Sequence, residues 1–486
     1  MIQRFLPLAL ALALGGCWGG AQQKDTKPVA VSVIGGELAA ADPSAGPLDT
    51  PARVLIDATA QGLVRFDGAG QIEPGLAASW AVTPDGRSYI FRLRDAAWQD
   101  GEPVTADQVV KVIRRAAAPN SRNALAPFLQ VIDEAVAMTP QVIEVRLKSP
   151  RPDLLKLFAQ PELAIVRGGS GTGPFVAQPE RKDAMLLRPM PEPTLPGDED
   201  AAKPDPRGQV LLRGGRAALG IARYKAGRAE LVLGGTFADW PIIGVAGIAP
   251  ADIRVDPAPG LFGLAVANRD GFLADAANRA ALAMAIDRAA LTAAIRTDWQ
   301  PVESVLPAQI DSSSPPSAPA WGPLTLSARR ENARTQVRNW KRTHPGPVTI
   351  RIALPSGPGA TLVWGSLMVS FRAIGVMPVR VGMADAADLR LIDAVAPYDS
   401  ARWFLATACQ LCSEDVALLI AAGRDAPDLY ARAHRIAEAD ALLAADSAYI
   451  PIAQPLRWSI VSPRLTGWQG NSRAWHPLNH LRNESE

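Results

Sequence analysis

Apolar and polar residues alternate in several short stretches of the chain, which is the pattern of β-strands with one buried face. The clearest of these stretches are residues 29–34, 142–147, 348–354 and 375–381. Residues 72–94 alternate on both sides of Pro84-Asp85-Gly86, and a Pro-Asp-Gly turn between such runs predicts a β-hairpin. We therefore expect short strands, some of them joined by tight turns.

Other stretches repeat their apolar residues at helical spacing. They cover residues 54–63, 108–116, 274–295, 362–373 and 427–445. Thr105 supplies an N-cap just before the second stretch, and the Ala-rich stretch 274–295 predicts one long helix. Because helices and strands mix along the chain, the pattern indicates an α/β or α+β body.

Three stretches have the composition of loops. Residues 189–208 are Pro-rich and charged, and residues 312–323 are rich in Pro and Ser; neither has any periodicity. The Gly-rich stretch 168–173 invites comparison with a phosphate-binding loop, but Pro174 starts a strand where such a loop would continue into a helix. We expect a connector at this position.

The first twenty residues have the pattern of an export signal. Arg4 precedes an apolar run over residues 5–14, which is shorter than the roughly 20 apolar residues that span a bilayer. Leu14-Gly15-Gly16-Cys17 resembles the bacterial lipoprotein cleavage box, so residues 1–16 are expected to be removed and Cys17 to carry the lipid. If Cys17 carries the lipid, residues 17–27 tether an extracytoplasmic body to the membrane. The alternative is an ordinary signal peptide in which this Cys is incidental.

Composition and charge exclude several classes of protein. Of the 486 residues, 48% are hydrophobic, which is enough for a large core, and the 50 Lys and Arg nearly balance the 48 Asp and Glu. This balance gives no electrostatic case for binding nucleic acid. Three Cys and four His argue against a disulfide framework, a metal site or haem, and no catalytic motif occurs. We expect no enzymatic activity and no cofactor.

Cys409-Gln-Leu-Cys412 is the one motif that resembles part of an enzyme. A Cys-x-x-Cys before a helix is able to act as a redox pair, because a helix N-terminus lowers a thiol pKa. The helix would begin near Ser413. An exported chain tends instead to oxidise neighbouring thiols to a structural disulfide. A structural disulfide, two inert thiols and a redox pair all remain open from the sequence.

Several spaced motifs over residues 55–115 resemble family 5 of the extracellular solute-binding proteins, which serve ABC importers of oligopeptides, dipeptides and nickel. The most telling is Glu73-Pro74-Gly75-Leu76-Ala77-Ala78-Ser79-Trp80. The others lie at residues 55–64, 85–94, 100–107 and 114–115. Later segments that resemble the family are residues 171–175, 224–231, 278–288 and 438–452.

The resemblance implies an α/β fold, namely a two-lobed periplasmic-binding-protein clamp of type II-like form with an inserted small α+β domain. Lobe 1 would combine residues 28–50, 163–258 and 453–486, with residues 51–162 as the inserted domain and residues 259–452 as lobe 2. Two chain crossings near residues 259 and 452 would form the hinge. A solute held between the lobes would stabilise the closed state, which a permease senses.

The resemblance also implies a ligand site. In peptide-binding relatives an Asp holds the amine of the ligand, and Asp399 matches it by position. Tyr398, Arg402 and Trp403 are the other candidate ligand-binding residues. The implied partners are a small peptide or peptide-like solute and an ABC permease in the inner membrane. We further expect a monomer in the periplasm, held to the inner or outer membrane by its lipid alone.

Two departures from the family leave a second function open. Relatives carry an aromatic residue shortly before the Asp, where this chain has Ala394-Val395-Ala396, and the Asp-Pro that usually follows is here Asp399-Ser400. The alternative is an interaction or structural lipoprotein that keeps the clamp fold without a transported ligand. A thiol-redox protein acting through Cys409 and Cys412 is a third hypothesis.

Overall fold

The computed structural model describes residues 27–181, 183–190 and 208–482. The predicted signal peptide, the lipidated Cys17 and most of the tether lie outside these residues, as does most of the predicted loop 189–208. Within the described part of the chain, no helix has both the length and the apolar character that crossing a membrane requires.

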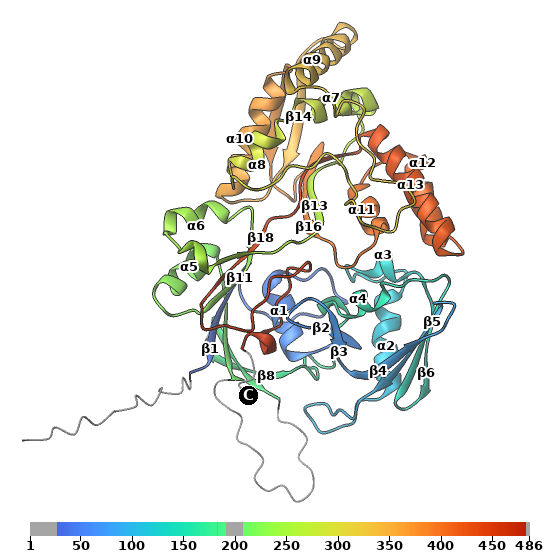
Figure 1. Cartoon of the computed structure of the whole chain (residues 1–486), viewed down its shortest axis with the longest axis vertical. Helices are drawn as coiled ribbons and strands as arrows, with labels where there is room; N and C mark the ends of the chain where they lie inside the picture. The colour runs from blue at the N-terminus through green and yellow to red at the C-terminus, as the bar shows by residue number, and fades with distance from the viewer. Residues whose placement is uncertain (1–26, 182, 191–207, 483–486) are drawn as a thin grey trace, which may run out of the picture.

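A seven-stranded sheet forms the core of the lower body in Figure 1, with strand order β12-β18-β11-β1-β10-β9-β8. Its central strand β1 pairs in parallel with β10 and β11, and the other neighbours in this sheet pair antiparallel. The strands are β1 (Val29–Ile34), β8 (Phe175–Arg181), β9 (Ala184–Pro189), β10 (Val210–Gly215), β11 (Leu231–Thr236), β12 (Ile253–Val255) and β18 (Arg457–Val461). Helices α1 (Thr50–Thr59), α5 (Ala217–Lys225) and α6 (Trp240–Ala246) belong to the same body.

A five-stranded sheet with order β15-β14-β16-β13-β17 forms the core of the upper body (Figure 1). Its strands are β13 (Gly260–Val266), β14 (Val348–Ala353), β15 (Val376–Val381), β16 (Leu389–Val395) and β17 (Tyr449–Ala453). Its helices are α7 (Ala276–Ala285), α8 (Arg288–Ala293), α9 (Leu326–Thr343), α10 (Pro358–Arg372), α11 (Ala401–Ala408), α12 (Glu414–Asp425) and α13 (Leu429–Asp446).

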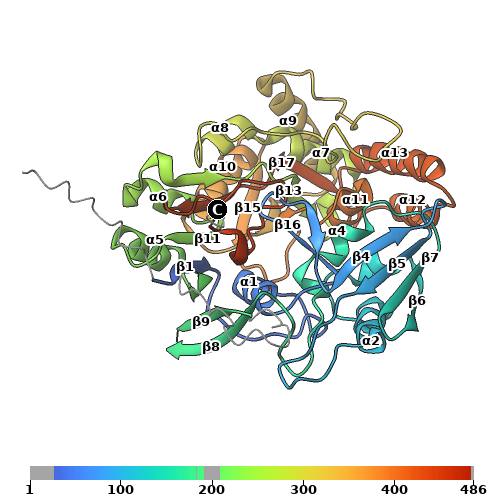
Figure 2. The ribbon, with the colours of Figure 1, turned by 60° about the horizontal axis from the view of Figure 1, so that its bottom comes forward.

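A small α+β unit lies beside the seven-stranded sheet, seen most clearly in Figure 2. Its antiparallel sheet, ordered β4-β5-β7-β6, is covered by α2, whose N-cap Thr105 forms a capping box with Gln108. The elements are β4 (Ala77–Val82), β5 (Ser88–Leu93), α2 (Ala106–Ala117), α3 (Ala126–Leu129), β6 (Ile132–Thr139), β7 (Val142–Leu147) and α4 (Leu154–Phe158). A two-stranded sheet of β2 (Val64–Phe66) and β3 (Ile72–Pro74) leads into it.

The fold is therefore the expected two-lobed clamp, and the chain passes between the two large sheets at two places. The first lies between β12 and β13, at residues 256–259, and the second between β17 and β18, at residues 454–456. Both run through the middle of the molecule in Figure 1. Two short connections that lie between the lobes allow one lobe to rotate against the other.

Most predicted elements are present. The strands expected at residues 29–34, 142–147, 348–354 and 375–381 and the hairpin around Pro84-Asp85-Gly86 are confirmed. The single helix predicted over residues 274–295 is wrong, because the chain forms α7 and α8 with a break at Ile286 and Asp287. The Asp287 carboxylate accepts a hydrogen bond of 2.9 Å from Ala290 N, so this side chain caps a new helix.

Candidate functional site

The two lobes meet in a polar interface at the segment between β16 and α11. Gln160 of the small domain donates from Nε2 to Pro397 O at 2.6 Å. Away from this segment, Gly359 N at the start of α10 donates to Ala238 O in the lower lobe at 2.8 Å. A Cβ on Gly359 would lie 1.9 Å from the Phe237 carbonyl oxygen, so this contact between lobes requires glycine.

Asp399 lies at the centre of this interface. Its carboxylate forms ion pairs with Lys156 of α4 and with Arg473 of the C-terminal segment, so both partners come from the opposite side of the interface. Burial raises the pKa of Asp399, but hydrogen bonds from Arg473 and Lys156 lower it by more, and the net pKa lies below its usual 3.8. Asp399, the residue predicted to bind the amine of a ligand, thus lies between the lobes and is held there by cations of the chain itself.

The other three predicted site residues separate into two groups. Tyr398 and Arg402 line the interface and pack on Phe128 of the small domain, at ring-centroid distances of 5.8 Å for Tyr398 and 5.6 Å for the Arg402 guanidinium carbon. Burial raises the pKa of the Tyr398 hydroxyl. Trp403 is turned into the hydrophobic core and packs edge-on against Phe404 at 5.0 Å, so it does not line the cavity between the lobes.

A small cavity of about 20 Å³ lies between the lobes beside Asp399, and we call it the arginine pocket. Four arginines line this cavity: Arg151 from the small domain, and Arg402, Arg424 and Arg432 from the upper lobe. Asp311, Tyr398, Ser400 and apolar side chains such as Phe128 and Leu157 complete the lining. Sequence reasoning identified Arg402 and Tyr398 but not the other cations.

Lys156, Arg473, Arg151 and Arg432 were missed because their positions carry no local signal. In the sequence, Lys156 looks like an ordinary exposed residue of a short helix, and Arg473 lies in a tail without periodicity. Lys156 and Arg473 become neighbours of Asp399 only through contacts between segments more than seventy residues apart, and Arg432 reaches Ser400 across 32 positions. No pattern in the sequence could have found them.

A third ion pair crosses between the lobes where the chain passes from one large sheet to the other. Arg457, at the start of β18, donates to the Asp393 carboxylate of β16 at 2.7 Å, and both side chains are largely buried. Burial raises the pKa of Asp393, and Arg457 only partly offsets this effect. The pair ties the two sheets at the point where the chain passes between them.

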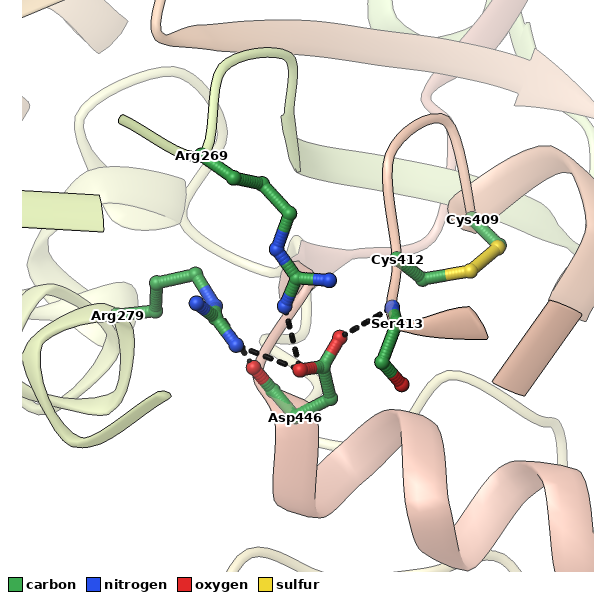
Figure 3. The surroundings of a disulfide bond; sticks show 6 residues. All are labelled: Arg269, Arg279, Cys409, Cys412, Ser413 and Asp446. Carbon is green, nitrogen blue, oxygen red and sulfur yellow. Dashed lines mark hydrogen bonds and ion pairs between the residues drawn. A yellow bond between two sulfur atoms is a disulfide. The ribbon is translucent and has the colours of Figure 1, made fainter. Parts of the chain in front are cut away.

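Cys409 and Cys412 are joined by a disulfide in the loop between α11 and α12 (Figure 3). The next residue, Ser413, donates its backbone N–H to the Asp446 carboxylate at 3.1 Å. The same carboxylate pairs with Arg269 and Arg279, so the loop is fixed to the rest of the upper lobe. The disulfide lies at the opposite end of α11 from the arginine pocket.

We expect replacement of both Cys409 and Cys412 with serine to lower the free energy of unfolding by only about 1–2 kcal/mol, since the closed loop is short. Urea denaturation of the purified protein measures this loss, and solute binding should not change. Thiol–disulfide exchange with a model substrate that disappears in the double variant would contradict a structural role and favour the redox hypothesis.

Within the described residues, no group of three or more His, Cys, Asp or Glu side chains is placed to hold a metal ion. The polar groups of the interface are carboxylates, an ammonium group and guanidinium groups that face one another across the two lobes.

Comparison with known proteins identifies one family. The sequence model described as "Bacterial extracellular solute-binding proteins, family 5 Middle" matches residues 71–335, more than half of the chain. The periplasmic oligopeptide-binding protein OppA of Salmonella typhimurium is 25% identical over 322 residues, which are 60% of this chain and 58% of that protein. The chain thus covers less than two thirds of that relative, and other curated relatives match over shorter stretches.

Solved structures have the same fold. Haemophilus influenzae OppA in complex with RPPGFSPFR has a TM-score of 0.78 at 18% identity, with 94% of this chain and 99% of that chain covered. Escherichia coli murein tripeptide binding protein MppA has a TM-score of 0.79 at 18% identity, covering 94% and 98%. For the unliganded open form of MppA the TM-score is 0.64 at 19% identity, covering 94% and 96%.

Proposed function

The chain belongs to family 5 of the bacterial extracellular solute-binding proteins, and from this premise we propose that it delivers a peptide or peptide-like solute to an ABC importer. In this proposal the mature protein is anchored in the periplasm through a lipid on Cys17 and acts as a monomer. The solute is captured between the lobes, and residues 256–259 and 454–456 form the hinge. The permease recognises the closed conformation. No catalytic step and no cofactor are part of the proposal.

The observation that carries this proposal is the position of Asp399. A residue predicted to bind a ligand amine lies between two lobes and faces cations from the opposite side. The Lys156 ammonium group makes the contact that a ligand ammonium would make, so a solute amine would take the place of Lys156 on the same carboxylate. Asp399 is 46% exposed, which leaves its carboxylate open to such an exchange.

The second candidate function is an interaction lipoprotein whose clamp closes without a ligand. The same ion pairs favour it, because Lys156 and Arg473 of the chain itself already pair with Asp399. The two candidates differ in whether a small molecule changes the distribution between open and closed lobes. To shift a two-state balance from 1:99 to 99:1, a solute must bind the closed state more tightly by about 5.5 kcal/mol.

We expect protein purified without denaturation to retain a small molecule that native mass spectrometry detects and names. After that molecule is removed by unfolding and refolding, the protein should have a larger radius of gyration in small-angle X-ray scattering. Adding the molecule back should restore the smaller radius.

A constant radius of gyration in the presence and absence of every co-purified molecule would contradict capture by closure and support the interaction lipoprotein.

A further inference from the structure

A groove on the lower lobe carries a local excess of positive charge, and we call it the basic groove. Its volume is about 520 Å³, which falls within the range of about 300–1,000 Å³ that is usual for sites of small ligands. The near balance of charge over the whole chain conceals this excess. The cations that line the groove are Lys27, Arg181, Arg213, Arg223, Arg228 and Arg464, and the acids are Asp183 and Glu230.

The seven-stranded sheet forms the floor of the basic groove. Ala30 of β1 lies beside Leu211 of β10 in register, and Arg213 follows two residues later on the same face of β10. Arg223 of α5 packs over the end of this strand, where its guanidinium group donates to Gly214 O at 3.5 Å. Regular structure therefore fixes these two arginines, while Lys27, Arg181 and Arg228 are exposed at the rim.

The two acids of the basic groove neutralise only part of its charge. Asp183 pairs with Arg223 at 2.8 Å, and Glu230 lies 3.8 Å from Arg464. In the part of the chain that the structure describes, four cations of the groove form no ion pair with a carboxylate: Lys27, Arg181, Arg213 and Arg228. A molecule that enters the groove therefore meets a net positive charge.

Arg213 experiences this charge most directly, because its side chain is half-buried among the others. Burial, followed by the charge of Arg223, lowers the pKa of its guanidinium group, and Arg181 and Arg228 add to this effect. Asp183 offsets it only in part. An anion between these groups would relieve the repulsion, and a phosphate group is able to accept from several guanidinium donors at once.

The basic groove is separate from the proposed solute site. Helix α5 and strand β1 lie on the opposite side of the molecule from α4 and α11 in both Figure 1 and Figure 2. No residue lines both the basic groove and the arginine pocket. A molecule bound in the groove would therefore not contact a solute between the lobes.

The position of Lys27 indicates which anion would be near. Lys27 is the last residue of the predicted tether and lines the basic groove. If Cys17 carries a lipid, the ten residues 18–27 separate the anchor from the groove, and they span at most about 35 Å. An anionic membrane surface attracts cations only within a Debye length of about 8 Å, so a groove next to the tether is placed to reach it.

We propose that the basic groove binds the phosphate-bearing headgroup of an anionic membrane lipid, so that the lower lobe rests on the membrane that holds the anchor. The inference rests on the proposed lipid on Cys17 and adds to it a second, electrostatic contact with the same membrane. One acylated residue and a basic patch together give firmer membrane attachment than either does alone. The contact also sets how the lobes are oriented relative to the membrane.

The test uses the mature chain with Cys17→Ser, which carries no lipid, and measures its sedimentation with lipid vesicles. Vesicles of phosphatidylglycerol and phosphatidylcholine in equal parts should bind the protein at low ionic strength. Vesicles of phosphatidylcholine alone should not bind it, and added sodium chloride should weaken the binding, because salt screens exposed charges. An equal affinity for both kinds of vesicle would overturn the inference.

A double variant identifies the groove as the contact. Arg181→Gln with Arg228→Gln removes two exposed cations, each of which changes the partition coefficient about five-fold, so the coefficient should fall about 25-fold. Arg338→Gln with Arg435→Gln removes the same charge from exposed positions on α9 and α13 of the upper lobe, and this control should bind as the parent chain does. Equal losses in the two double variants would overturn the inference.

Inorganic phosphate distinguishes a lipid headgroup from a free anion. If sodium phosphate raises the thermal unfolding midpoint through Arg181 and Arg228 while no vesicle binds, the groove holds a free anion and the lipid contact is wrong. Sodium chloride at the same ionic strength is the reference for this measurement.

Mass spectrometry of protein extracted from membranes tests the anchor separately. A lipid on Cys17 without vesicle binding would overturn the groove inference and leave the proposed function standing. Vesicle binding through Arg181 and Arg228 without a lipid on Cys17 would support the groove and remove the anchor. The co-purified solute should close the lobes equally in both double variants, because the groove lies away from the interface between the lobes.

Discussion

Replacing Asp399 with asparagine is expected to shift the clamp toward its open state by about 1.5–3 kcal/mol, the usual contribution of a hydrogen bond to a charged group. In this structure the Asp399 carboxylate pairs with both Lys156 and Arg473, which lie across the interface between the lobes. The Arg473 side chain is only 5% exposed; its Nη2 pairs with Asp399, and its Nε has no hydrogen-bond partner among the described residues. Asparagine would leave this buried cation without a counter-charge, whereas opening the lobes would return it to water.

The size of this shift is measurable as a population. A change of 1.4 kcal/mol alters an equilibrium constant tenfold. The equilibrium constant for closure of the ligand-free protein should therefore fall by about ten-fold to a hundred-fold. Förster resonance energy transfer between dyes on the two lobes would measure the distribution between the open and closed states. Asp415→Asn on the exposed face of α12 is the matched control. An unchanged distribution in Asp399→Asn would show that the two ion pairs do not hold the lobes.

Acid should weaken the same contact. Because the pKa of Asp399 in the closed state lies below its usual 3.8, closure favours the ionised carboxylate. The contribution of Asp399 to closure is therefore complete at neutral pH. It is lost as the pH falls below about 4 and through the lowered pKa.

Replacing Asp446 with alanine is expected to cost about 3–5 kcal/mol of folding stability, the usual result of removing one partner from a buried ion pair. Asp446 ends α13 and its carboxylate accepts from Arg269, Arg279 and the backbone N–H of Ser413 (Figure 3). Arg279 is 2% exposed in side chain, and burial lowers its pKa despite the neighbouring Asp446. Without the carboxylate, this guanidinium would remain charged and unpaired in the core.

Urea denaturation with separate reporters for each lobe would locate the loss. It should fall on the lobe built around the five-stranded sheet, because all four groups belong to it. Asp415→Ala, in the exposed first turn of α12, should change stability by less than 1 kcal/mol. A loss of similar size in both variants would mean that the network around Asp446 is not what stabilises this lobe.

Local chemistry explains why many elements could be predicted. The hairpin around Pro84-Asp85-Gly86 and the Thr105 cap depend on residues within a few positions, and both are present. Helix 274–295 failed because a run of Ala and Leu has helical periodicity even where the chain bends. The break depends on Asp287, whose side chain caps α8 while its backbone N–H contacts Ser370 Oγ at 3.4 Å. That second contact joins residues 83 positions apart.

The sequence by itself determined many of the strands and helices, the family and the candidate carboxylate Asp399, since alternation, caps and motifs are properties of neighbouring residues. Only the tertiary structure decided that Lys156 and Arg473 meet Asp399, that Trp403 turns into the core and that Arg151 faces Arg402. The physical reason is that charge pairing acts through space: its energy depends on distance and burial, and both are fixed by how two lobes close on each other.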